Sequence, residues 1–100
     1  MNTEITDRIR SANILHKRRC IAAFLHERTK QGKPTTIREI AAAYGWDPRH
    51  INSVVRSMVG EVIETTFGPV IVQHTGQRTS TGGVTANVYA AILHHKNQNQ

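Results

Sequence analysis

The sequence predicts an α+β fold in which three helices come first and β-strands follow. Up to Gly60, apolar residues recur at the spacing of helix faces, and a tight break at Gly45 separates two short helical patterns. Beyond Gly60, β-branched residues become frequent and apolar residues alternate with polar ones, which is typical of strands. One hundred residues suffice for one domain with one modest core. We therefore expect a single α+β domain.

The first helical pattern covers residues 3–30. Ile14, Ile21 and Leu25 share one face of this helix, with basic residues on much of the remainder. Residues 11–13 are compatible either with a break and a new N-cap or with one longer helix. A glycine and then a proline follow the pattern and end it.

The domain organisation follows from these patterns. We expect an N-terminal helical extension over residues 1–13 and a folded domain over residues 14–93. Residues 94–100 are polar and are expected to form a disordered tail.

The second and third helical patterns are separated by a very short turn. Thr36 and Glu39 have the spacing of a capping box, in which each side chain bonds to the other residue's backbone N–H. Gly45 is expected to end the second helix in a left-handed conformation, which a side chain would strain. Asp47 is then an N-cap, and Pro48 occupies the first helical position, where a missing N–H costs little.

The third helix is expected over residues 48–59, with one apolar face and one polar face. Its apolar face contains Ile51, Val54, Val55 and Met58. Trp46 precedes this helix and stands in the position of a hydrophobic staple to Ile51, which fixes the direction of entry into the helix.

The rest of the chain predicts strands. The β-prone runs are residues 62–66, 70–75 and 84–93, with a bend at Gly68-Pro69 between the first two. The polar, glycine-containing stretch 76–83 between the last two runs is expected to be a flexible hairpin tip.

Charge favours an anionic partner. The chain has thirteen Lys and Arg against seven Asp and Glu, so its net charge is +6. No acidic residue follows Glu64. No apolar run approaches the roughly 18 to 20 residues needed to span a bilayer, and the N-terminus lacks the pattern of a secretory signal. We expect a soluble cytoplasmic protein without a membrane partner.

This order of elements resembles the winged helix-turn-helix family over about residues 14–93. Ala41 stands at the small position where the two helices of the motif cross, and Gly45 stands in the turn four residues later. Ile40, Tyr44 and Trp46 fall where the motif has apolar packing, and the ending TANVYAAIL resembles a returning wing strand. The resemblance implies a three-helix core with a helix-turn-helix, followed by a β-hairpin wing.

The same resemblance implies sequence-specific binding of double-stranded DNA by a small transcriptional regulator. The recognition helix 48–59 would enter the major groove, and the wing 70–93 would lie on the flanking backbone or minor groove. The residues expected to contact DNA are Arg49, His50, Asn52, Ser53, Arg56 and Ser57 on the third helix, Gln77, Arg78 and Thr79 at the hairpin tip, and Arg38 on the second helix.

Other interpretations stay open. Winged-helix domains also act as protein–protein adaptors, and accessory factors in replication or recombination would need the same DNA-binding surfaces. The apolar residues Ile5 and Ile9 are compatible with a homodimer or another protein partner through the N-terminal helix, and also with packing onto the domain's own core. His16 and Cys20 share a helix face, but no further ligands complete a metal site, so we expect no metal and no other cofactor. No catalytic motif is present, and an enzyme is not expected.

Overall fold

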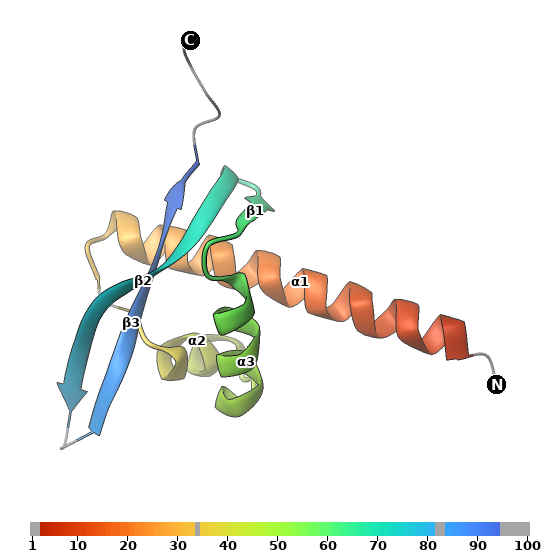
Figure 1. Cartoon of the computed structure of the whole chain (residues 1–100), viewed down its shortest axis with the longest axis horizontal. Coiled ribbons are helices and arrows are strands. Elements are labelled where there is room, and N and C mark those ends of the chain that lie inside the picture. The colour runs from red at the N-terminus through yellow and green to blue at the C-terminus, as the bar shows by residue number, and fades with distance from the viewer. Residues whose placement is uncertain (1–2, 34, 82–83, 95–100) are drawn as a thin grey trace, which may run out of the picture.

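Three helices precede a three-stranded antiparallel sheet, which confirms the predicted α+β class (Figure 1). The computed structural model describes residues 3–33, 35–81 and 84–94, and side chains within 13–33, 35–76 and 86–94. In chain order, the elements are α1 (Thr3–Lys30), α2 (Ile37–Tyr44), α3 (Pro48–Met58), β1 (Val62–Thr65), β2 (Gly68–Thr81) and β3 (Val84–Leu93).

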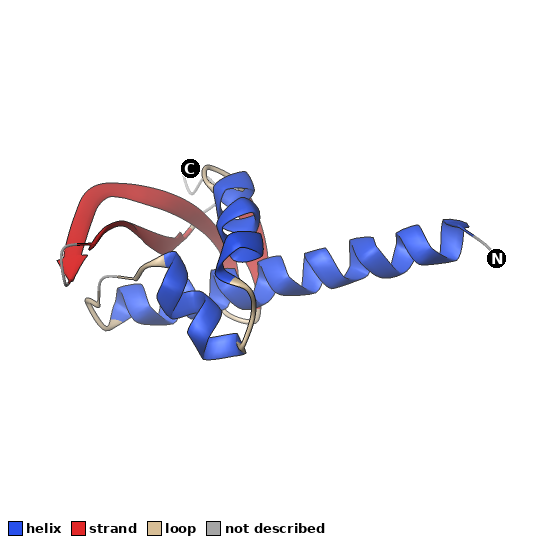
Figure 2. Cartoon of the chain, turned by 90° about the horizontal axis from the view of Figure 1, so that it is seen from below, coloured by secondary structure: helices blue, strands red, loops and turns tan. Residues whose placement is uncertain are grey.

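Helix α1 is one continuous helix of 28 residues, so residues 11–13 form no break. Ile21 and Leu25 are fully buried on the face that packs against the rest of the molecule. Ile14 lies seven residues before Ile21 and so on the same side of the continuous helix, as the sequence predicts, but it is 45% exposed and does not extend the core. Figures 1 and 2 show the physical reason: the N-terminal half of α1 extends beyond the other elements, and no other described helix or strand covers it.

The local signals around α2 and α3 act as the sequence predicts. The Glu39 backbone N–H donates to Thr36 Oγ1 at 3.3 Å, and the Thr36 N–H donates to Glu39 Oε1 at 2.9 Å, completing the capping box. Gly45 has φ +70°, the left-handed conformation that a C-terminal glycine supplies. The Arg49 N–H donates to Asp47 Oδ1 at 2.9 Å, which confirms the N-cap of α3.

The sheet corrects two expectations. The bend was expected at Gly68-Pro69, but both residues belong to β2: Gly68 pairs with Thr65 and Pro69 with Glu64. The chain reverses direction at residues 66–67 instead. Gly68, with φ +110°, follows this turn and is already the first paired residue of β2.

The sequence predicts a flexible hairpin tip over 76–83, but β2 continues to Thr81 and β3 begins at Val84. Residues 82–83 of this stretch lie outside the described part. Thr81 pairs with Val84, and the register shifts once, between His74 and Arg78. The polar residues are therefore accommodated by strand pairing with a β-bulge, in which Gly76 adopts φ +80°. Residues 95–100 of the predicted tail lie outside the described part, whereas the His94 N–H donates to the Pro69 carbonyl at 2.8 Å.

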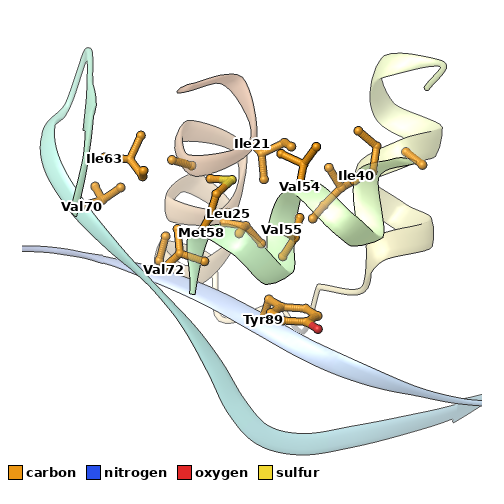
Figure 3. Packing of buried hydrophobic residues seen from close by; sticks show 14 residues of the cluster. Ile21, Leu25, Ile40, Val54, Val55, Met58, Ile63, Val70, Val72 and Tyr89 are labelled. Atoms are coloured by element: carbon orange, nitrogen blue, oxygen red, sulfur yellow. The ribbon is translucent and has the colours of Figure 1, made fainter. Parts of the chain in front are cut away.

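The core lies between α1, α2, α3 and the inner face of the sheet. Figure 3 shows side chains from all these elements pointing toward one another: Ile21, Leu25, Ile40, Val54, Val55, Met58, Ile63, Val70, Val72 and Tyr89. The predicted apolar face of α3 is confirmed, since all four of its residues are buried. The other face of α3 is therefore the one that faces away from the core.

The outer edge of β3 is bonded to the helical layer. The Tyr89 N–H donates to the Thr35 carbonyl at 2.8 Å, and the Ala91 N–H donates to Thr29 Oγ1 at 3.1 Å. Arg28 joins the same region, because its guanidinium contacts Glu39 at 2.7 Å. These contacts tie the end of α1, the start of α2 and β3 into one unit.

Replacing Gly45 by alanine should lower the free energy of unfolding by about 1–2 kcal/mol, because a Cβ strains a left-handed backbone. No atom of another part of the chain lies within 4 Å of the position a Cβ would take. The loss of stability therefore comes from backbone strain and not from a clash with neighbouring atoms. Urea denaturation followed by circular dichroism measures it. Gly45→Asn is the matched control and should lose less, since asparagine tolerates this conformation. Equal losses would contradict the assigned role of the turn.

Candidate nucleic-acid interface

The outward face of α3 carries most of the predicted site. Arg49, His50, Ser53, Arg56 and Ser57 are exposed, and Asn52 is half-buried. No acidic residue occurs between Pro48 and Gly60, so the face offers hydrogen-bond donors and two fixed positive charges. Such a face is suited to an anionic partner with many acceptors.

Two of the predicted groups also take part in structure. The Ser57 hydroxyl donates to the Val54 carbonyl of its own helix at 2.6 Å, so it presents only acceptor capacity outward. The Arg49 backbone N–H is bound to Asp47, whereas its side chain is exposed. Arg38 is also exposed, but it belongs to α2 and not to α3.

A column of rings and cations fixes the α2–α3 turn on α1. The rings of Tyr44 and Trp46 stack with centroids 4.4 Å apart and planes 13° apart. Tyr44 meets the ring of Phe24 from α1 edge-on at 5.9 Å, and Lys17 Nζ lies 5.5 Å from the centroid of Trp46. The stacking and cation–π contacts hold the entry to α3 against the longest helix.

The hydroxyl of Tyr44 adds a directional bond to this column. It donates to the Cys20 carbonyl of α1 at 3.1 Å. Burial, and secondarily the neighbouring Cys20 thiol, raises the pKa of Tyr44 above its usual value. The hydroxyl therefore keeps its proton, and the hydrogen bond persists, throughout the neutral pH range.

The three predicted hairpin contacts lie in a strand and not in a loop. Arg78 pairs with Asn87 and Thr79 with Ala86, while Gln77 falls within the register shift of β2. Their side chains lie outside the described part of the structure. Their backbone positions place them on the distal half of the β2–β3 hairpin, which extends away from the helices (Figures 1 and 2).

An open cleft of about 450 Å³ separates α3 from this hairpin. It is lined by Asn52, Arg56 and Val59 on the α3 side and by His74, Asn87 and Tyr89 on the hairpin. We call it the α3–hairpin cleft. The structure thus brings Asn52 and Arg56 together with three hairpin residues that the sequence did not single out, because their relation to α3 depends on the strand register.

Lys17, Arg18 and Arg19 form a basic run on α1 that takes part in the fold. Lys17 lies over Trp46, and Arg18 forms an ion pair with Glu61. Arg19 is the exposed member of the run. Cys20 Sγ lies 3.5 Å from His16 Nε2, which confirms that the two residues share a helix face. Among the described residues, no group of three or more His, Cys, Asp or Glu could hold a metal ion.

Comparisons with known proteins give no information about this site. No family model, no curated protein and no solved structure matches this chain. In the described residues, none of the helices combines the length and apolar character that crossing a membrane requires.

Trp46→Ala should destabilise the fold by about 2–3 kcal/mol, because it removes a partly buried ring that packs on the core and stacks on Tyr44. Thermal and urea unfolding measure the loss. Tyr44→Phe is the control within the same column: it keeps the ring stack and should lose only about 1 kcal/mol for the hydrogen bond to Cys20. A Trp46→Ala loss no larger than that of Tyr44→Phe would contradict the bracing role.

Proposed function

We propose that this chain is a winged helix-turn-helix domain that binds double-stranded DNA in a sequence-specific manner. In this proposal, α3 is the recognition helix in the major groove, and the β2–β3 hairpin is the wing on the flanking backbone or minor groove. The chain then serves as a small transcriptional regulator. The same surfaces would serve an accessory factor in replication or recombination.

The observation that carries the proposal is the composition of the outward face of α3. Most of its residues are exposed, and they include arginine, the side chain that makes bidentate contacts to guanine edges. A helix needs a fixed angle to present such residues to a groove, and the ring column on α1 supplies a rigid support for that angle. A purely structural helix would not need an outward face free of carboxylates.

An adaptor function is the second candidate, and one surface favours it. On the sheet, Val62 pairs with Ile71, and Ile71 pairs with Ile92 across all three strands. Val62 and Ile92 are 44% and 43% exposed. Such an apolar row is suited to a protein partner, and a gel shift at physiological ionic strength separates the two candidates.

Arg49→Ala should weaken binding to the preferred duplex by about 1–3 kcal/mol and weaken binding to a scrambled duplex less, because a base-edge contact is lost only at the preferred sequence. The preferred duplex is obtained by selection from a randomised DNA pool, and fluorescence anisotropy gives both affinities. Arg19→Ala removes the same charge from an exposed position on α1 and is the control.

Two results would count against the proposal. If the wild-type chain selects no sequence and binds no duplex at physiological ionic strength, DNA binding is wrong. If Arg49→Ala and Arg19→Ala weaken both duplexes equally, α3 does not read bases.

We further propose that two copies pair through the N-terminal half of α1. That half extends beyond the body in Figure 1, and at its base Ile14 and Leu15 are 45% and 46% exposed. The sequence adds Ile5 and Ile9 on one face of the same helix. A paired molecule would read two half-sites, which lengthens the recognised sequence.

The double variant Ile5→Asp, Ile9→Asp should be monomeric and should lose affinity for a two-half-site duplex, while its far-ultraviolet circular dichroism stays close to that of the wild type. Light scattering gives the mass of both proteins. Asn13→Asp adds charge at an exposed position of α1 and should leave the dimer intact. A wild-type chain that is monomeric while bound to its preferred duplex would refute the pairing.

A further inference from the structure

The α3–hairpin cleft holds a histidine whose tautomer is set by the backbone. The Gly76 N–H donates to His74 Nδ1 at 3.0 Å. Because an N–H group can only donate, Nδ1 carries the lone pair, and the proton of the neutral ring lies on Nε2. His74 therefore offers one N–H donor from a cleft-lining ring that is itself exposed.

The orientation of this ring is fixed on two sides. Gly76 sits at φ +80° in the bulge of β2, which turns its N–H back onto the imidazole. On the other side, the His74 ring meets the ring of Tyr89 edge-on, with centroids 5.2 Å apart and planes 87° apart. Tyr89 is only 5% exposed and is anchored through its backbone to Thr35. The donor is thus preorganised before any ligand arrives.

The remaining polar groups of the cleft also suit an acceptor. Arg56 brings a fixed positive charge and five N–H donors, and Asn52 and Asn87 each bring an amide NH₂. None of the six described lining residues carries a carboxylate. Phosphodiester oxygens only accept hydrogen bonds, and one negative charge per phosphate matches the single arginine.

We propose that the α3–hairpin cleft holds a sugar–phosphate strand of the duplex and that His74 binds it as a neutral N–H donor. The proposal rests on the proposed DNA binding. A helix in the major groove has a phosphate strand beside it, and the cleft is the space beside α3 on the side of the hairpin. Bases are then contacted elsewhere.

This assignment divides the outward face of α3. Asn52 and Arg56, one helical turn apart, contact the backbone from the wall of the cleft. Arg49 and Ser53, which do not line the cleft, are left to contact base edges. The sequence alone predicts DNA contacts for all four residues without this division.

His74→Phe tests the donor, because it keeps a ring beside Tyr89 and removes the N–H. Affinity should fall about tenfold for the preferred and the scrambled duplex alike, since a phosphate contact carries no sequence information. The salt dependence should stay that of the wild type at mildly alkaline pH, because a neutral donor releases no counterion. His74→Gln, whose amide N–H can replace the donor, should stay within about threefold of the wild type.

The controls make the result decisive. His94→Phe changes an exposed histidine that does not line the cleft and should bind both duplexes as the wild type does. Arg56→Ala should weaken both duplexes and lower the salt slope by about one unit. Thermal unfolding of every variant confirms that it folds.

Failure of the cleft assignment differs from failure of DNA binding. A wild-type chain that binds no duplex overturns both. If the wild type binds DNA and His74→Phe binds it with unchanged affinity, the assignment of the cleft is wrong, whereas DNA binding stands. Losses confined to the preferred duplex for His74→Phe or Arg56→Ala would assign these residues to bases and likewise overturn it.

Discussion

The angle between α2 and α3 is the constraint on which the candidate interface depends. One left-handed residue, Gly45, sets the direction of the turn, and the stacked rings of Tyr44 and Trp46 attach that turn to α1. The glycine alone would give a bend of low cost but little rigidity, because a single backbone conformation leaves the two helices free to pivot. The ring stack restricts that freedom, because it adds contacts between the turn and α1 to the hydrogen bonds within each helix.

A second attachment sets the distance between α3 and the hairpin. Tyr89 is bonded through its backbone to Thr35, packs its ring in the core, and meets His74 with the ring edge. One residue of β3 is therefore shared by the helical layer, the core and the cleft. Because Thr35 also adjoins the capping box of α2, the hairpin and the α2–α3 pair are positioned from the same short segment of chain.

The predictions from sequence were accurate where the determining contacts are local. The caps at Thr36 and Asp47 and the turn at Gly45 involve residues within four positions of each other, so their spacing suffices. The exposure of Ile14 could not be predicted, because periodicity shows which face of a helix is apolar but not where the packing partners of that face end. His74 and Asn87 escaped notice for a similar reason: a bulge of β2 shifts the register beside them, and only the register relates them to α3.

The distribution of charge bears on how such an interface would gain affinity. Part of the net charge of +6 is committed within the fold, since Arg18 pairs with Glu61 and Lys17 lies over Trp46. Arg49 and Arg56 are the cations on the outward face of α3, and most of their neighbours are neutral hydrogen-bonding groups. Neutral donors release no counterions, so affinity from this face would depend on salt less steeply than the overall charge suggests. With few charges to attract DNA non-specifically, such an interface gains most from geometry: a braced helix, a donor already oriented at His74, and a second copy that doubles the contacted sequence.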